Sequence, residues 1–259
     1  DNSLATDQPV TGLVGAAVVP RRVSFSKESV QHLSPLSSEH ELFKDYDGSA
    51  DNAAQLFRGG DGGQLMSLTN SKESQKIGLY LCSKAKSGER LVLIGYTFDR
   101  ADIRDELIHA QGRCVIVRVF LDSRTTKSTQ LQLAATSELV RSGITVQLLQ
   151  GVPIQSEYEE AGRHTSSSGR GICHAKYVRL GKYLMLGSTN WTTSSRCNLE
   201  QGALLHLSDE AERRQYERER SFINDANHDR PLDVEDVTRL SGSVRERSAS
   251  KSRKDYGHF

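Results

Sequence analysis

Three short apolar segments separated by helical patterns constrain the fold of this chain more than any other feature. Residues 90–98 (RLVLIGYTF) and 114–121 (CVIVRVFL) are nearly continuous apolar runs, and 144–149 (ITVQLL) is a third. Runs of this kind are typical of strands buried on both faces of a sheet. Helical patterns occupy 101–110 and 129–141, between the runs. This β-α-β-α-β order predicts parallel strands joined by helical crossovers.

A hairpin with polar, reactive side chains is predicted further along the chain. Residues 175–180 alternate as a strand does, Gly181-Lys182 indicates a tight turn, and 183–186 returns as the second strand. The small residues at 187–190 (GSTN) then form a turn that a ligand can approach closely. The open end of this hairpin is therefore the predicted binding site.

That open end gathers His174, Lys176, Ser188 and Asn190. An imidazole, an ammonium, a hydroxyl and a carboxamide together suit a phosphodiester, because a neutral imidazole can attack phosphorus while Lys and Asn donate hydrogen bonds to its oxygens. Glu200 is a further candidate, since a carboxylate that accepts one ring proton fixes the tautomer of an imidazole. None of the other histidines in the sequence stands in an H-x-K pattern.

The pattern H-x-K at 174–176 followed by G-S-x-N at 187–190 resembles the HKD signature of the phospholipase D superfamily. The continuation WTT at 191–193, with Glu200 in N-L-E, is similar to the branch that carries a single motif. That branch includes a mitochondrial cardiolipin hydrolase and a bacterial periplasmic endonuclease. Gly181 stands where the signature has Asp, and the spacing from His to Gly-Ser is one residue shorter. Both differences fall in the hairpin turn.

The resemblance covers roughly residues 72–224 and implies an α/β/α sandwich, with a mixed, largely parallel sheet flanked by helices. It implies that His174 is the nucleophile of a metal-independent phosphodiesterase and forms a phosphohistidine. Lys176 and Asn190 would bind phosphate oxygens, Ser188 would assist, and Glu200 would orient the imidazole. Neither a cofactor nor a metal is implied. One motif supplies one imidazole, whereas the reaction needs a nucleophile and an acid, so a homodimer is expected to complete each site.

Two substrates stay open within this interpretation. The first expectation is a phospholipid of the cardiolipin type, with association at a membrane surface; the alternative is single-stranded RNA or DNA. A catalytically inert phosphate-binding scaffold with the same fold is a third hypothesis, which rests on Gly181 and the shortened turn. The net charge of +1 gives no general attraction to nucleic acid or anionic membranes, so attraction must come from local patches.

The remaining sequence is interpreted as polar flanks around one folded unit. An apolar share of 36% is low for a chain of 259 residues. We expect an irregular N-terminal region and linker at 1–70, a catalytic domain at 71–224, and a disordered basic, Ser/Arg-rich tail at 225–259. The polar stretch at 150–171 is expected to form the rim of the site.

The cysteines and the apolar segments say little about location. No C-x-x-C pair occurs among the four cysteines, Cys82, Cys114, Cys173 and Cys197. We therefore expect them to be small buried residues and not part of a zinc site or a disulfide framework, and this usage favours a reducing compartment. No apolar run reaches the roughly 18 residues that span a bilayer, and 10–19 is interpreted as a loop or mobile tail. The sequence features alone do not indicate a cellular location. The resemblance implies that the protein is intracellular and lies at the mitochondrial surface.

Overall fold

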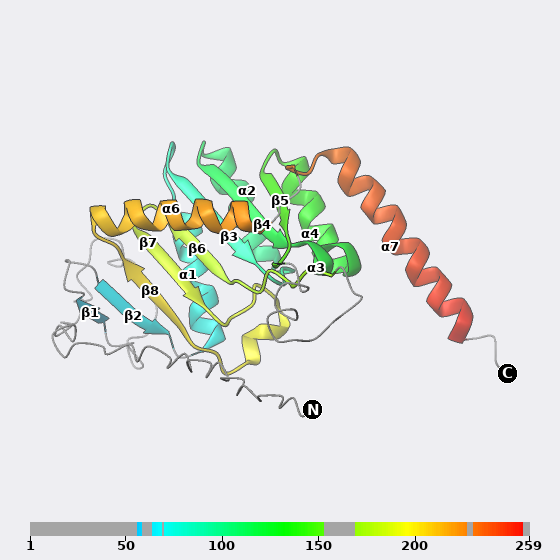
Figure 1. Ribbon diagram of the computed structural model, residues 1–259, viewed down its shortest axis with the longest axis horizontal. Helices are drawn as coiled ribbons and strands as arrows, with labels where there is room; N and C mark the ends of the chain where they lie inside the picture. The colour runs from blue at the N-terminus through cyan, green and yellow to red at the C-terminus, as the bar shows by residue number, and fades with distance from the viewer. Residues whose placement is uncertain (1–55, 59–63, 69, 153–168, 227–229, 256–259) are drawn as a thin grey trace, which may run out of the picture. The chain divides into compact units, whose positions relative to one another are not determined.

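The described part of the protein is built around one mixed β-sheet. A computed structural model describes residues 56–58, 64–68, 70–152, 169–226 and 230–255, all within the unit His32–Phe259. In these residues eight strands form a sheet with the order β1-β2-β8-β7-β6-β3-β4-β5 (Figure 1). The strands are β1 (Leu56–Arg58), β2 (Gln64–Leu68), β3 (Arg90–Gly95), β4 (Ile116–Asp122), β5 (Thr145–Leu149), β6 (Tyr177–Leu180), β7 (Tyr183–Gly187) and β8 (Gly202–His206).

Parallel pairing is confined to one half of the sheet. β3, β4 and β5 are parallel, as the β-α-β-α-β order predicted, whereas all the other adjacent pairs are antiparallel. The mixed α/β class is therefore confirmed, but the share of parallel pairing is smaller than expected. The reason is that the β6–β7 hairpin joins β3 in antiparallel register, and β8, β2 and β1 extend the sheet from it.

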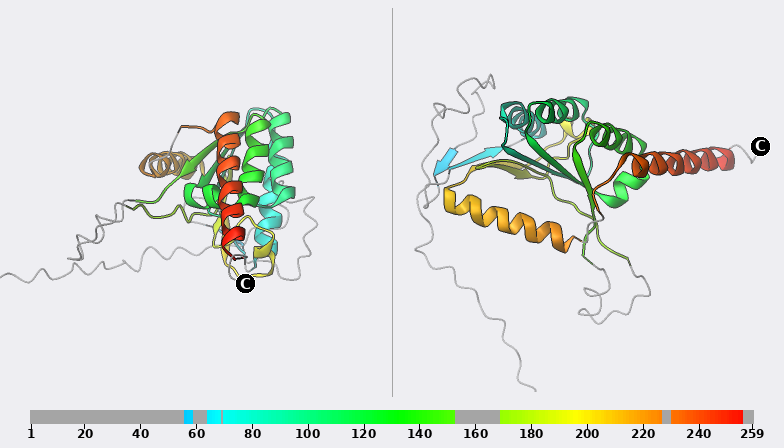
Figure 2. Two further views of the ribbon diagram at one scale, coloured as in Figure 1. Left: turned by 90° about the vertical axis from the view of Figure 1, so that its right-hand side faces the viewer. Right: turned by 90° about the horizontal axis from the view of Figure 1, so that it is seen from above.

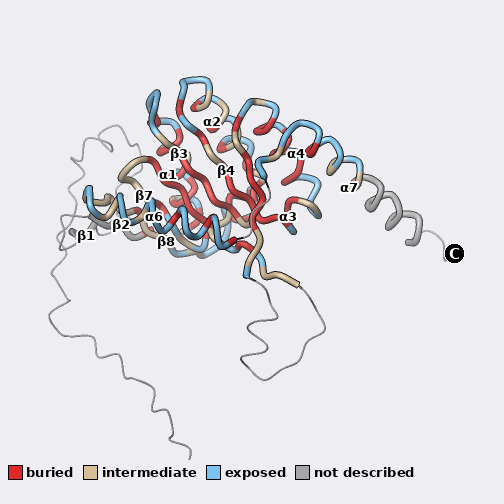
Figure 3. The backbone as a smooth tube through the Cα atoms, turned by 45° about the horizontal axis from the view of Figure 1, so that its top comes forward, coloured by how far each residue is buried: buried red, intermediate tan, exposed pale blue. Residues whose placement is uncertain are grey.

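Helices cover both faces of the sheet (Figure 2). α1, α2 and α4 pack on one face and α6 on the other. Leu91 and Leu93 of β3 belong to the core beneath α1, α2 and α4, while Val92 and Ile94 belong to the core beside Ile223 of α6. The central strands are largely apolar because most of their residues are buried on both faces of the sheet (Figure 3). The helices are α1 (Ser71–Lys84), α2 (Ala101–Gly112), α3 (Ser123–Ser128), α4 (Gln130–Arg141), α6 (Asp209–Asp225), α7 (Val234–Asp255) and the 3₁₀ helix η4 (Ser194–Cys197).

Two expectations about the flanks of the sheet are wrong. Residues 56–58 and 64–68, expected to be irregular, form β1 and β2, because β2 pairs antiparallel with the free edge of β8. The expected tail without regular structure is helix α7 over Val234–Asp255. Its polar composition hides an apolar stripe: Val237 and Val244 lie two helical turns apart, are buried, and face the core where α7 packs against α4. The expectations for residues 1–55 lie outside the described residues.

None of the helices in the described part of the chain combines the length and the apolar character needed to cross a membrane.

Candidate active site

The open end of the β6–β7 hairpin brings the two parts of the motif together. β6 starts directly after Lys176, and β7 ends at Gly187. The Gly187 backbone N–H donates to the Lys176 carbonyl, with N and O 3.3 Å apart. Segments 174–176 and 188–190 therefore leave the same end of two neighbouring antiparallel strands, as the sequence predicted.

Ser188 joins this turn to the segment that carries Glu200. The backbone N–H of Ser188 donates to the Gln201 carbonyl at 2.9 Å, and its hydroxyl accepts from the Gln201 N–H at 3.1 Å. The two backbones approach so closely that a Cβ on Gly187 would lie 2.6 Å from the Gln201 carbonyl oxygen. Glu200 is thus held next to the motif turn, and the Ser188 hydroxyl is engaged with the backbone of its neighbour.

Lys176 carries its charge in a buried position. The residue is only 5% exposed, and its Nζ donates to the His174 carbonyl at 2.7 Å. Nζ also lies 5.1 Å from the ring centroid of Tyr96, at cation–π distance. Burial lowers the pKa of Lys176, and the negative charge of Glu200 partly offsets this effect. A cation that is held with few water neighbours is suited to receive an anion.

His174 is exposed, and its ring rests against Tyr96. The two ring centroids are 4.6 Å apart, and the planes are tilted by 54°. One aromatic ring therefore contacts both residues of the H-x-K pair. The exposed imidazole can reach a ligand from solvent, while Tyr96 restricts its orientation.

Asn190 offers a side chain that is not used within the protein. Its Oδ1 is buried and has no hydrogen-bond partner among the described residues, and the same holds for Thr189 Oγ1. The Asn190 backbone is fixed, because Gln75 Nε2 donates to its carbonyl at 2.8 Å. A buried polar atom without a partner costs about 1–3 kcal/mol, and a ligand would recover this energy.

Trp191 anchors the motif turn from below. Its ring is fully buried, and Nε1 donates to the Ile94 carbonyl at 3.2 Å. A Cβ on Gly78 of α1 would lie 2.6 Å from this ring, so the helix can approach the ring only with glycine at that position. Trp191 therefore packs beneath the loop. Asp99 accepts from the Thr193 backbone N–H at 2.7 Å and so ties the turn to the segment between β3 and α2.

Glu200 lies beside the site in a contact that differs from the expected one. It is half-buried, and its Oε1 accepts from the side-chain amide of Asn198 at 3.1 Å. In the described residues no hydrogen bond joins Glu200 to the His174 ring. Its electrostatic effect falls on Lys176, and its role in orienting the imidazole stays a prediction.

With this geometry in view, a comparison with known families is decisive. A family model described as cardiolipin synthase, PLD-like domain, matches residues 81–221, more than half of the chain. The chain belongs to the phospholipase D superfamily. The matched residues run from α1 to α6 and include every candidate site residue. Membership supports a phosphodiester-related activity, either hydrolysis or phosphoryl transfer.

Among solved structures with low sequence identity, two with TM-scores of 0.50 or more share the fold of this phospholipase D-like chain. NucT from Helicobacter pylori is 15% identical, with a TM-score of 0.52 over 63% of this chain and 97% of that one. Phosphatidylserine synthase from Haemophilus influenzae Rd KW20 is 13% identical, with a TM-score of 0.50 over 74% of this chain and 47% of that one. Nuc from Salmonella typhimurium, a phospholipase D family member, is 18% identical, with a TM-score of 0.49 over 64% and 99% of the two chains. No curated protein matches the chain.

Asp122 is a site residue of this phospholipase D-like fold that sequence reasoning missed. Asp122 Oδ1 accepts from the Thr125 N–H at 2.7 Å and caps α3. Oδ2 accepts from the Cys173 N–H at 2.8 Å, directly before His174. Tyr96 was missed as well. Tyr96 directly follows β3, and Asp122 is the last residue of β4. Because ligands of open α/β sheets bind at the carboxyl ends of parallel strands, these positions in the sequence could have indicated both residues.

Other expectations around the site have mixed outcomes. Cys82 and Cys173 are buried, as expected, and burial raises the pKa of both thiols, that of Cys82 to about 12. The expectation is wrong for Cys114 and Cys197, which are exposed. The described residues contain no group of three or more His, Cys, Asp or Glu placed to hold a metal ion. Most of the stretch expected to form the rim, at 153–168, lies outside the described residues.

Proposed function

We propose that this chain hydrolyses the phosphodiester of a phospholipid of the cardiolipin type, without a metal ion, through a phosphohistidine at His174. The observation that carries the proposal is the meeting of segments 174–176, 188–190 and 200–201 at one end of β6, β7 and β8. An exposed imidazole adjoins a buried ammonium there, next to a carboxamide with an unpartnered end. The NH₂ end of that amide has the same shape as its oxygen end and can donate to a phosphate oxygen.

The proposed reaction has two displacements at phosphorus. The unprotonated ring nitrogen of His174 attacks phosphorus, and the bond from phosphorus to the leaving oxygen breaks as that oxygen takes a proton from a general acid. Water then attacks the phosphohistidine, which releases a phosphate monoester and restores the imidazole. Lys176 and Asn190 stabilise the charge that develops on the non-bridging oxygens in both steps.

Exposed apolar side chains beside the site favour a lipid over a nucleic acid. Ile172, two residues before His174, is 37% exposed, and Leu199, directly before Glu200, is 97% exposed. Exposed apolar groups next to an anion-binding site suit a substrate with acyl chains or a membrane surface. The net charge of +1 adds no general attraction to a polyanion.

We further propose that the general acid is the same histidine of a second copy of the chain. In a two-fold dimer each surface meets its own copy, so the two exposed imidazoles would share one site. One ring would stay neutral and the other protonated, which gives a bell-shaped pH–rate profile for the pair. A purified heterodimer of wild-type and His174→Ala chains should then lack activity. Half-normal activity in that heterodimer would refute the shared site.

The proposed function is tested by a paired assay in the presence of EDTA. Cardiolipin liposomes and labelled single-stranded RNA and DNA are incubated in parallel with the wild-type chain, His174→Asn and His109→Asn. We expect hydrolysis of cardiolipin that is lost only in His174→Asn, because His109 is a surface histidine of α2 with a side chain 69% exposed. If only the nucleic acids are hydrolysed, the proposed phospholipid substrate is wrong. A folded wild-type chain that cleaves none of the phosphodiesters would favour the inert scaffold.

A further inference from the structure

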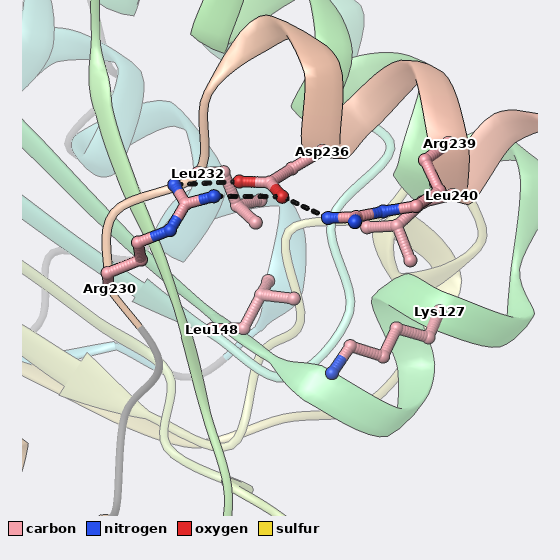
Figure 4. A pocket seen from close by; sticks show the side chains of 7 residues that line it. All are labelled: Lys127, Leu148, Arg230, Leu232, Asp236, Arg239 and Leu240. Carbon is pink, nitrogen blue, oxygen red and sulfur yellow. Dashed lines mark hydrogen bonds and ion pairs between the residues drawn. The ribbon is translucent and has the colours of Figure 1, made fainter.

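A basic hollow with an apolar floor lies between α3, β5 and α7, apart from the residues of the candidate active site. Its volume is about 390 Å³, within the range of small-molecule sites. Figure 4 shows its side chains. The floor consists of Leu148, Leu232 and Leu240, and the charged lining consists of Lys127, Arg230, Arg239 and Asp236.

Two arginines converge on one carboxylate in this hollow. Arg230 and Arg239 both form ion pairs with Asp236, whose side chain is only 10% exposed (Figure 4). A carboxylate accepts a few hydrogen bonds, and one position on Asp236 is taken by the Asp233 N–H at 3.1 Å. Arg230 also donates to the Pro231 carbonyl and to Asp233. Each guanidinium has five N–H donors, so Arg239 in particular retains donors beyond the one that Asp236 uses. Asp236 thereby holds two forked donors in place at the edge of a cavity.

The charge balance of the hollow favours an anion. The lining holds three basic side chains, those of Lys127, Arg230 and Arg239, and one acidic side chain, that of Asp236. Arginine pairs with phosphate in a planar, two-bonded geometry, and preorganised donors reduce the cost of ordering on binding.

We propose that this hollow is a second anion site that binds a phosphate ester, with the phosphate against Arg230, Arg239 and Lys127 and the apolar part of the molecule on the leucine floor. The ester is either a phospholipid headgroup or a soluble organic phosphate, because both present the same group. The site goes beyond the proposed hydrolysis and does not depend on it. It adjoins the catalytic segment through α3, which carries Lys127 and is capped by Asp122, the residue that also holds Cys173.

The test uses phosphate monoesters, which a phosphodiesterase does not consume. Binding of glycerol 3-phosphate is measured by calorimetry, and binding to phosphatidylcholine vesicles with or without phosphatidic acid by co-sedimentation. We expect the wild-type chain to bind at least one of these probes, and the double variant Lys127→Gln/Arg239→Gln to bind it about tenfold or more weakly, since the variant loses two charge-assisted hydrogen-bond donors. This variant keeps the Arg230–Asp236 pair, so the buried carboxylate stays neutralised.

Two controls separate this site from general charge and from the candidate active site. Arg213→Gln/Arg214→Gln removes the same charge from exposed, ion-paired arginines of α6 and should leave binding unchanged. Lys176→Ala should affect only binding at the candidate active site and should keep the binding that Lys127→Gln/Arg239→Gln removes. Binding to glycerol 3-phosphate alone identifies a soluble ligand, and binding to phosphatidic acid vesicles alone identifies a lipid. The proposal is overturned if neither probe binds, or if the two double variants weaken binding equally. It is also overturned if only Lys176→Ala abolishes binding.

Discussion

At the scale of single residues, Lys176 combines a cost in stability with a proposed role in binding. Its ammonium is buried, and the hydrogen bond to the His174 carbonyl, the Tyr96 ring and the charge of Glu200 compensate only partly, so its pKa lies below the ordinary value of 10.5. A group with a lowered folded-state pKa binds fewer protons when folded than when unfolded. For a lysine this means that the buried charge lowers the free energy of unfolding at neutral pH. This loss of stability disappears as the pH rises to 10.5, where the lysine of the unfolded chain also loses its proton.

Replacing this charge should therefore separate stability from activity. Lys176→Met is expected to keep or raise the free energy of unfolding at pH 7, because the buried charge is removed, while turnover falls about a hundredfold through loss of an oxyanion donor. Urea unfolding at neutral pH and near pH 10 checks the sign: the wild-type chain should gain stability relative to the variant as pH rises. A variant less stable than wild type at pH 7 would show that the charge is fully compensated.

Tyr96 acts at the same scale as a positioning residue for the H-x-K pair. Its ring contacts both the His174 ring and Lys176 Nζ, and such contacts are worth about 0.5–1.5 kcal/mol each. Tyr96→Leu is expected to lower kcat about tenfold with little change in KM, whereas Tyr96→Phe stays within about threefold because it keeps the ring. Steady-state kinetics on the phospholipid checks this. An equal loss in both variants would assign the effect to the hydroxyl instead.

At the scale of elements, the β6–β7 turn explains how the chain departs from the family signature. Gly181 has a φ of +51°, in the left-handed region, and no atom lies within 4 Å of a Cβ placed there. The turn joins the strand ends opposite to those that carry Lys176 and Ser188. Gly181 therefore serves the backbone of the hairpin, at a distance from the reacting groups.

Substitutions at Gly181 should act on stability alone. Gly181→Ala is expected to cost about 1–2 kcal/mol of unfolding free energy, while Gly181→Asn and Gly181→Asp cost less because their side chains tolerate this region. Turnover of the folded variants should equal that of wild type. Denaturant unfolding combined with the cardiolipin assay checks both parts, and a gain of more than tenfold in turnover for Gly181→Asp would contradict this account of the turn.

Helix α3 is capped by Asp122, which also holds the segment before His174. Asp122→Asn retains one side-chain acceptor, so it loses either the cap on Thr125 or the hydrogen bond from Cys173. We expect a loss of about 1–3 kcal/mol in stability and a clear fall in kcat, because the segment before His174 is no longer held. Ser208→Ala removes the corresponding cap of α6 and should cost stability without a change in kcat. Equal kcat in both variants would reduce Asp122 to a structural cap.

At the scale of the whole molecule, the sequence predicted those elements that form through interactions between residues close together in the chain. The buried strands β3 to β5, the helices between them and the hairpin follow from apolar runs and turn residues. The pairing of β2 with β8 could not be predicted, because it joins backbones far apart in sequence, and the helical stripe of α7 is diluted by charged residues. The H-x-K and G-S-x-N segments were correctly placed together, whereas Tyr96 and Asp122 act through tertiary contacts that no short motif encodes.

The covalent step at His174 is the central claim, and trapping it is the most direct test. The wild-type chain is mixed with phospholipid labelled at phosphorus, stopped within the first turnover by denaturant at alkaline pH, where a phosphorus–nitrogen bond survives, and cleaved into peptides. We expect label on the peptide that contains His174, located on the imidazole, and none in His174→Asn. Full turnover by the wild-type chain with no label on His174 at any quench time would contradict the account.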